Sequence, residues 1–469
     1  MLFIEGRFFV FFLIVFTVHW WLRGMRVRKN WLLLCSYVFY GAWNWKFLSL
    51  ILISTLIDFT AGRRLQETDD PSRRKRWLIT SMVANLGFLG IFKYYNFFAE
   101  SAHEFLGWLG LHPSAFTLEI VLPVGISFYT FQTMSYTIDV YRRKLRAVDR
   151  FWDFALFVAF FPQLVAGPIV RAVDFIPQLY EKRKFKRHVD VRACLILFLV
   201  GYIKKACLAD NAAQVADEVF ANPAAYSTLS NWIALAMYHI QVYGDFAGYS
   251  DMAIATAGLL GYRLTDNFDF PYFSPSIGEF WRRWHISLGT WLKDYLYVPL
   301  GGSWCSWPRR IRNIYVTMVL CGLWHGAGWK FVTFGALHAT YVAVNRYWKH
   351  AVPPGGFMAL LTKYGAHILT TYCLFFGWTI FRSEGFDKTL DMMRIFFFVD
   401  RGGTQAVSSL WGLFFIVCAL VHWGCYKGYF RALWARLPAD AFALVYGISW
   451  ALVLPWVPTG YRAFIYFQF

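Results

Sequence analysis

The chain has 469 residues, of which 58% are hydrophobic and only 16% charged; because a soluble domain carries about 25% charged residues, this composition excludes a soluble multidomain enzyme, a disordered chain and a fibrous repeat. Aromatic residues make up 21% of the chain, which is typical of a membrane protein with aromatic belts at its two interfaces. Lys and Arg outnumber Asp and Glu by 18. Since these cations lie in short clusters between apolar runs, we expect membrane lipids around the protein and no nucleic-acid partner.

Apolar runs that could form membrane helices follow one another along the chain. A membrane helix needs about 20 mostly apolar residues, so the sequence predicts an all-α polytopic membrane protein with about 10 to 12 membrane helices, some too short to cross alone. We expect one domain over residues 1–469, made of N-terminal helices (1–150), a core (151–350) and C-terminal helices (351–469). The runs, in chain order, are Phe8–Leu22, Trp31–Trp43, Phe47–Ala61, Trp77–Phe98, Leu118–Tyr141, Phe151–Val165, Ala193–Leu208, Trp232–Leu260, Ile314–Trp324 with Phe331–Val344, Ile368–Phe381, Trp411–Gly424 and Ala441–Val457.

The basic clusters predict which side of the membrane the loops face. Loops rich in Lys and Arg stay in the cytoplasm, so Arg23–Asn30, Arg63–Arg76 and Arg171–Arg192 are expected inside and the N-terminus outside. A basic cluster and no cleavage site follow the first apolar run, which we therefore expect to be a retained helix. Two prolines and a glycine in Phe161–Arg171 exclude a straight helix, and we expect a re-entrant or interfacial element there.

His325 is the first candidate for chemistry, because an ionisable side chain inside a membrane is costly and therefore marks function. Basic clusters on both sides of its region predict a hairpin that enters and leaves from the cytoplasm. At about 1.5 Å per residue, roughly 16 Å separates Ile314 from His325, which predicts a deep position. A core histidine bound to a carbonyl is equally compatible with the pattern. Glycines near the apex would admit another backbone or a substrate: Gly322, Gly326 and Gly328.

The segment Phe280–Gly302 is the second candidate. Its apolar residues recur at helical spacing, and we expect one amphipathic helix over Phe280–Tyr295 in the cytoplasmic interface. On this helix Arg282, Arg283 and Lys293 could bind the phosphates of an anionic donor, whereas snorkelling to lipid phosphate is the competing interpretation. A second, basic stripe on the same helix consists of Arg282, His285, Gly289 and Lys293.

Other polar residues of the apolar runs are expected to be structural. His338 lies thirteen residues after His325, on roughly the opposite helix face, and is expected to be a core histidine. Asp245 and Asp251 are expected to form ion pairs with a neighbouring Lys or Arg, and Asp58, near the end of a run, to need no special explanation. The eight cysteines contain no C-x-x-C pair and predict neither a disulfide framework nor a metal site.

No motif in the chain supports ATP hydrolysis, nicotinamide chemistry, zinc proteolysis or a serine hydrolase. Ser287 in HISLG copies part of G-x-S-x-G, but it lies on a predicted helix and not on a strand-to-helix turn. The residues alone leave two classes open: a group-transfer enzyme with a histidine base, and a transporter with histidines on a proton or ion path. Because the two halves of the chain show no repeat, the enzyme is favoured.

Several blocks, taken in order, carry a family resemblance. They begin with SYVFYGAWNW (Ser36–Trp45) and end with FIYFQF (Phe464–Phe469), and between these lie Leu122–Arg142, Phe161–Arg171, Asp245–Ala255, Phe280–Gly302 and Cys321–Trp329. In these blocks the sequence resembles the membrane-bound O-acyltransferase (MBOAT) superfamily, in its branch of bacterial alginate O-acetyltransferases. The resemblance implies a bundle of membrane helices around a central tunnel.

The resemblance also implies the active-site residues. His325 matches the invariant histidine of the family and His285 its second active-site position. We expect His325 to be the general base and His285 to position or polarise the thioester, because a neutral imidazole accepts a proton at cellular pH. Trp284 and Trp324 are expected to take part in donor binding and to keep water away from the thioester.

The implied reaction moves an acetyl group from a cytosolic thioester, acetyl-CoA or an acyl carrier, across the bacterial inner membrane. No metal or permanently bound cofactor is implied. The product is an O-acetylated exopolysaccharide of the alginate or cellulose type, made together with a periplasmic acetyltransferase partner. Peptidoglycan O-acetylation and teichoic-acid D-alanylation are the alternative enzyme functions, and a proton-coupled transporter is the alternative outside enzymes. The polymer, the donor and the oligomeric state stay open.

Overall fold

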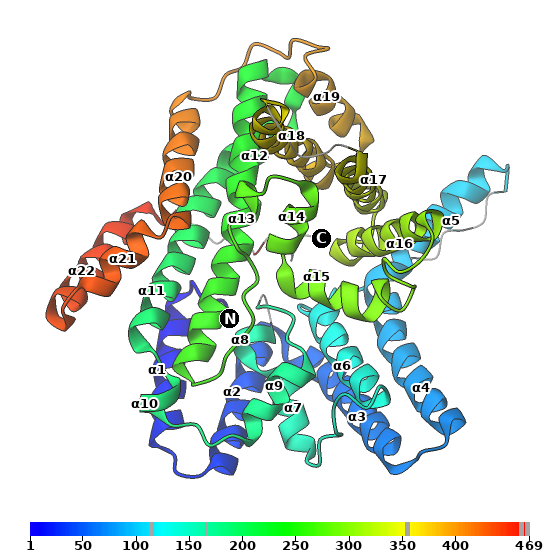
Figure 1. The fold of residues 1–469 in the computed structure, drawn as a ribbon, viewed down its shortest axis with the longest axis vertical. Helices are drawn as coiled ribbons and strands as arrows, with labels where there is room; N and C mark the ends of the chain where they lie inside the picture. The colour runs from blue at the N-terminus through cyan, green and yellow to red at the C-terminus, as the bar shows by residue number, and fades with distance from the viewer. Residues whose placement is uncertain (112–113, 115–116, 165–166, 352–356, 459–463, 465–469) are drawn as a thin grey trace.

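The computed structural model describes the chain except residues 112–113, 115–116, 165–166, 352–356, 459–463 and 465–469 (Figure 1). Within the described residues every regular element is a helix, and the β-type pairs are isolated bridges. The all-α prediction is therefore confirmed, and each predicted apolar run contains a helix. Val165, at the end of one run, and the last five residues of the terminal block lie outside the described residues.

The first third of the chain folds into helices, drawn in blue and cyan in Figure 1. Short turns join the first five of them, and residues 109–125 separate the fifth from the sixth. Pro71 occupies the first turn of α4, and the Asp70 side chain before it accepts a hydrogen bond from the Ser72 amide at 3.0 Å, as expected of a helix start. A π-helical segment, η2 (Gly90–Tyr94), joins α4 to α5. The helices are α1 (Gly6–Trp21), α2 (Met25–Asn44), α3 (Leu48–Glu67), α4 (Pro71–Leu89), α5 (Tyr95–Trp108) and α6 (Ile126–Tyr141), with a 3-10 turn at Trp45–Phe47.

The start predicted for the run Leu118–Tyr141 is wrong, because α6 begins only at Ile126. Gly125, directly before it, has a left-handed φ of +77°. A Cβ at Gly125 would also lie 2.6 Å from the Leu164 carbonyl oxygen. Glycine fits both the left-handed backbone and the close approach, and the chain can therefore turn into α6 at this point.

Asp58 contradicts the expectation that it needs no special explanation. Its side chain is fully buried and accepts hydrogen bonds from Ser81, from Asn85 at 2.8 Å and from Thr137 at 2.8 Å. These donors lie on α4 and α6, so one side chain of α3 connects three helices. The apolar run ends at Ala61, but α3 continues to Glu67, so Asp58 lies inside the helix and not near its end.

The centre of the molecule is α13 (Thr228–Leu259), a helix of 32 residues that is mostly buried (Figure 1). Its contact with α11 is close: a Cβ on Gly201 would lie 2.7 Å from the Gly248 carbonyl oxygen, and a Cβ on Gly248 would lie 2.6 Å from that of Gly201. The core helices before α14 are α7 (Phe151–Ala159), α8 (Phe161–Leu164), α9 (Ala172–Tyr180), α10 (Phe185–His188), α11 (Val191–Tyr202), α12 (Asp210–Ala221) and α13, with short turns at Pro223–Ala225 and Pro271–Phe273.

The ion pairs predicted for Asp245 and Asp251 are confirmed. A π-helical segment, η3 (Ile203–Ala209), continues α11 and supplies both partners. Lys204 pairs with Asp251 at 2.6 Å, and Lys205 pairs with Asp245 at 2.7 Å. Buried charges require such partners, since breaking a buried pair is strongly destabilising.

The predicted irregular segment Phe161–Arg171 is confirmed, since α8 ends at Leu164 and α9 begins at Ala172. Protein groups bind its backbone at both ends. The Phe161 amide donates to the Ser36 hydroxyl at 3.1 Å, and the Ile169 amide donates to the Ser287 hydroxyl at 3.0 Å. Non-helical backbone at membrane depth needs this kind of satisfaction; the membrane position of the segment stays a prediction.

The remaining helices complete the core and form an arm. The arm, α20 to α22, is drawn in orange and red in Figure 1; α20 runs along the body and α21 and α22 project on one side. The helices are α14 (Ile277–Arg283), α15 (Ile286–Leu292), α16 (Trp307–His325), α17 (Trp329–Ala351), α18 (Phe357–Arg382), α19 (Phe386–Phe396), α20 (Leu410–Tyr426), α21 (Tyr429–Arg436) and α22 (Ala439–Val453), with a π-helical segment η6 (Lys293–Tyr297) and a 3-10 turn at Leu454–Trp456.

By length and apolar composition, three helical stretches among the described residues could cross a membrane: Met25–Glu67, Pro71–Trp108 and Ala439–Trp456. Helices α20 and α21, bent by 62° at their junction, would form a fourth. α1 is apolar but shorter than these stretches. The number of crossings stays a prediction.

Candidate active site

His285 lies at a break between two helices, and the single amphipathic helix predicted over Phe280–Tyr295 is wrong. α14 ends at Arg283, Trp284 is extended, and His285 has a left-handed φ of +46° before α15 begins. A distant segment imposes the break, because the Asp269 amide donates to the Arg283 carbonyl at 3.0 Å and the Ile286 amide donates to the Asn267 carbonyl at 2.9 Å. Non-glycine residues with positive φ concentrate at functional sites.

The break separates His285 from the cations of the predicted basic stripe. His285 is buried, whereas Arg282 and Lys293 are exposed. Arg282 pairs with Glu279, and Arg283 donates from Nε to the same carboxylate at 3.0 Å. The hydrogen bond from Arg283 holds the pKa of Glu279 below its ordinary value. Of the three predicted donor-binding cations, Arg282 and Lys293 therefore lie on the surface, and Arg283 is half-buried in its ion pair with Glu279.

Asn267 orients the His285 ring. Its Oδ1 lies 2.9 Å from the Ser287 hydroxyl, 3.3 Å from the Ser287 amide and 3.1 Å from His285 Nδ1, while its Nδ2 donates to the Ser250 hydroxyl at 3.1 Å. Because an amide oxygen only accepts, His285 must carry its proton on Nδ1. Nε2 is then the basic nitrogen, and it has no hydrogen-bond partner among the described residues.

His325 is the last residue of α16, at the turn of the hairpin that α16 forms with α17. The predicted hairpin is confirmed as a fold, while its cytoplasmic side stays a prediction, and both histidines are buried. His325 Nε2 lies 4.0 Å from the Cys321 sulfur, one helical turn earlier. The turn is tightly packed, because a Cβ at Gly326 would lie 2.0 Å from the Phe331 ring.

The two imidazoles face a common aromatic surrounding. Their ring centroids are 6.5 Å apart. Trp324 contacts both rings edge-on, with centroids 5.5 Å from His285 and 5.1 Å from His325. Phe246 packs against His285 at 4.6 Å, and Phe381 packs against His325 at 5.6 Å. An atom between the rings would therefore meet two imidazoles and apolar walls.

Trp284 does not share this position, although it is the residue before His285. Its indole stacks with Phe280, with centroids 5.4 Å apart, and packs against Trp378 of α18 at 5.1 Å. The structure thus brings together His285, His325 and Trp324 from the predicted set.

His338 is a core histidine, as predicted. The Trp281 indole N–H lies 3.2 Å from His338 Nδ1, and the Phe334 ring packs against the imidazole at 4.4 Å. All eight cysteines are free thiols. Among the described residues, no group of three or more His, Cys, Asp or Glu side chains could hold a metal ion.

Sequence reasoning missed two groups at the site. No sequence pattern around Asn267 predicts that its side chain contacts His285, which lies eighteen residues later in the chain. Lys93 could have been found by the argument applied to His325, because it is an ionisable residue inside an apolar run. Its ammonium donates to the Trp324 carbonyl at 2.6 Å. Ser287 is confirmed as a helical residue and not a nucleophile elbow.

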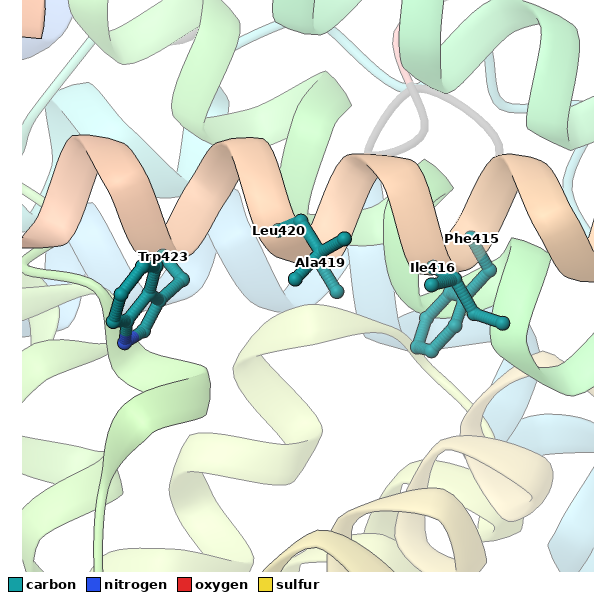
Figure 2. A pocket seen from close by; sticks show the side chains of 5 residues that line it. All are labelled: Phe415, Ile416, Ala419, Leu420 and Trp423. Carbon is teal, nitrogen blue, oxygen red and sulfur yellow. The ribbon is translucent and has the colours of Figure 1, made fainter.

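Two pockets differ in character. One, of about 380 Å³, lies against the α16–α17 turn and is lined by Ile91, Phe92, Lys93, Asn96, Ile120, Leu122, Ala327, Lys330 and Phe331. The other is an apolar groove along α20, shown in Figure 2 and lined by Phe415, Ile416, Ala419, Leu420 and Trp423. The groove on α20 has no acid or base in its lining, whereas the first pocket adjoins the turn that follows His325. The tunnel implied by the resemblance stays a prediction.

Comparison with known proteins gives one consistent result. Residues 32–382 match the model of the family described as "MBOAT, membrane-bound O-acyltransferase family". A Pseudomonas aeruginosa protein named "Probable alginate O-acetylase AlgI" is 41% identical over 413 residues, which cover 87% of this chain and 77% of that protein. The peptidoglycan O-acetyltransferase of Helicobacter pylori is 34% identical over 408 residues, with 82% and 76% covered. The teichoic acid D-alanyltransferase of Bacillus subtilis is 24% identical over 285 residues, with 56% and 69% covered.

Proposed function

Because this chain belongs to the membrane-bound O-acyltransferase family and is a membrane O-acetyltransferase, we propose that it takes an acetyl group from a cytosolic thioester and passes it across the bacterial inner membrane. The acetyl group then serves O-acetylation of an exopolysaccharide, through a periplasmic acetyltransferase partner. The donor is acetyl-CoA or an acyl-carrier thioester. We propose a multi-pass topology with the basic loops in the cytoplasm.

The observation that carries the proposal is the pair of buried imidazoles with centroids 6.5 Å apart in an aromatic surrounding. A thioester is already activated, so the enzyme must mainly move protons and hold two reactants together. We propose His325 as the general base and His285 as the group on the thioester side. The aromatic wall, Trp324 above all, excludes the water that would hydrolyse the thioester.

The proposed step balances its protons. An acceptor hydroxyl gives its proton to His325 while its oxygen attacks the thioester carbonyl carbon. The C–O bond forms, the C–S bond breaks, and the imidazolium returns its proton to the departing thiolate. In the tautomer fixed by Asn267, His285 Nε2 accepts a hydrogen bond; it can hold an N–H or O–H of the donor, and it donates to a carbonyl only when protonated.

An acceptor of the alginate class is favoured over peptidoglycan by degree of similarity. The relative named for alginate acetylation is 41% identical and the one named for peptidoglycan acetylation is 34% identical. The D-alanyltransferase matches over a smaller share of this chain, 56%. Acetylation of alginate-type polymer by cells that carry the chain and its partner would support this choice, and acetylation of peptidoglycan alone would overturn it.

The test of the acid–base assignment compares two buried histidines of one hairpin. His325→Ala should give a membrane-inserted protein that transfers no acetyl group to polymer, since the base is lost. His338→Ala is the matched control, because it removes a buried imidazole outside the site, and it should keep acetyl transfer when the protein folds. Acetylation at the wild-type rate by His325→Ala would exclude His325 as the base. Proton flux in liposomes without any acyl donor would favour a transporter.

A further inference from the structure

The end of α16 that carries His325 is held by a distant segment of the chain. The last carbonyls of a helix lack partners within the helix. Here the Tyr94 hydroxyl donates to the Leu323 carbonyl at 2.8 Å. The Lys93 ammonium lies 2.6 Å from the Trp324 carbonyl oxygen and 3.4 Å from that of His325. Two neighbouring side chains thus bind three successive carbonyls at the terminus.

Both side chains come from η2, the π-helical segment between α4 and α5. Short π-helical segments within helices occur frequently at functional sites. In a regular α-helix, successive side chains point about 100° apart, which separates neighbours onto different faces. Lys93 and Tyr94 nevertheless reach the same helix end, so the irregular turn serves this contact.

The ammonium of Lys93 also interacts with the C-terminal end of α16 through its charge. Among the described residues no carboxylate pairs with Lys93; its contacts are the two carbonyls, the Ser127 hydroxyl at 3.4 Å and the face of Trp324 at 6.0 Å. A cation near the C-terminus of a helix is stabilised by the helix dipole. The negative end of the α16 dipole therefore stabilises the ammonium charge, and the ammonium holds the last carbonyls of α16 in place.

The opposite side of the hairpin is fixed by glycines. A Cβ on Gly322 would lie 2.1 Å from the Phe331 carbonyl oxygen, and a Cβ on Gly335 would lie 2.4 Å from that of Met318. α16 can therefore not shift toward α17. The contact with Lys93 and Tyr94 determines its position on the other side.

We propose that Lys93 and Tyr94 are positioning residues that set the place of the His325 imidazole for proton transfer. This inference rests on the proposed role of His325 as the base. A displacement of about 1 Å can cost about 100-fold in rate, so loss of the clamp lowers kcat while the binding of donor and acceptor is kept.

The pocket beside the hairpin makes the inference testable by chemical rescue. Lys93 lines this pocket of about 380 Å³, so a small alkylammonium ion can reach the space left by a truncated side chain. The amide of Asn96, in the same lining, is already bonded to Leu118 at 2.9 and 3.0 Å. The pocket therefore gives access to the position of the ammonium.

The experiment measures acetyl transfer from a radiolabelled acetyl thioester by purified full-length protein with its acetyl acceptor. Lys93→Met should lower kcat by about 100-fold with both KM values near wild type. Lys93→Arg should recover part of the loss, and Tyr94→Phe should give a smaller decrease. The matched controls are Lys75→Met, an exposed lysine of α4, and Tyr95→Phe, and both should keep wild-type kcat.

Chemical rescue separates positioning from general destabilisation. Ethylammonium should raise the kcat of Lys93→Ala and leave the wild type and Lys75→Met unchanged. If Lys93→Met fails to fold, the rescue and the Tyr94→Phe rate decide the question. Wild-type kcat in folded Lys93→Met, or no rescue together with an unchanged Tyr94→Phe, would overturn the inference. His325→Ala is measured in parallel to distinguish this result from failure of the proposed function. Full activity of His325→Ala would show that His325 is not the base, whatever the Lys93 variants do.

Discussion

Replacing Asn267 with alanine tests how the tautomer of His285 is fixed. The substitution removes the acceptor of the His285 Nδ1 proton, at 3.1 Å, and of the Ser287 hydroxyl, at 2.9 Å. Ser287 Oγ also lies 3.5 Å from His285 Nδ1. In the variant this hydroxyl can donate to Nδ1, which moves the ring proton to Nε2. The imidazole would then present a donor where the wild type presents an acceptor.

The magnitudes follow from burial. Each buried donor left unpaired costs about 1–3 kcal/mol, and because the hydroxyl and the ring can pair with each other, we expect a total loss of about 1–3 kcal/mol. The rate should also fall, by about 100-fold, because His285 Nε2 would no longer accept the hydrogen bond by which it is proposed to hold the donor in place. The assay measures kcat of acetyl transfer, and thermal unfolding of the same preparations measures stability.

The second substitution makes the reasoning refutable. In Asn267→Ala/Ser287→Ala no side chain donates to Nδ1, so the ring can again carry its proton there, and kcat should rise above that of Asn267→Ala. Stability should fall further, because the Ile169 amide loses its acceptor at 3.0 Å. A double variant slower than the single one, or a folded Asn267→Ala with wild-type kcat, would show that the tautomer is not what Asn267 controls.

Two further predictions concern packing and charge. Gly326→Ala places a Cβ 2.0 Å from the Phe331 ring and should lower stability by about 1–3 kcal/mol in thermal unfolding. Gly328→Ala, with its nearest contact to Phe331 at 3.7 Å, should be neutral; equal melting temperatures would refute the packing argument. Lys205→Met removes the ammonium that binds Asp245 at 2.7 Å and Asp210 at 2.6 Å, and it should cost about 3–5 kcal/mol. Recovery of the melting temperature by adding Asp245→Asn would support this account, and a further decrease would contradict it.

Features that depend on local pattern could be predicted from the sequence. The glycines around His325 and the basic clusters on both sides of it predict a hairpin with the histidine near its turn, which the structure confirms. The acids of α13 predict cationic partners, and Lys204 and Lys205 are those partners. Both inferences depend only on the residues of one segment. One uses the cost of burying a charge in apolar surroundings, and the other uses the preference for glycine at tight turns.

Features imposed by distant segments could not be predicted in this way. The apolar residues of Phe280–Tyr295 keep a helical period through His285, yet pairing with residues 267–269 breaks the helix there. Asp58 is at the end of an apolar run but inside a longer helix, and its donors come from two other helices. Spacing within a segment contains no information on such partners.

The hydrogen bond from Asn267 to Ser250 has a consequence for how the protein can vary. Ser250 belongs to α13, so the orientation of the His285 ring depends on the long, mostly buried helix at the centre of the molecule. The arm, α20 to α22, meets this line of contacts from outside, because the His422 ring of α20 packs against Tyr243 of α13 and against Phe270, with centroids 5.2 and 5.0 Å apart. Exchanging the arm for that of a relative should therefore change the rate of acetyl transfer unless the new arm keeps a ring at position 422.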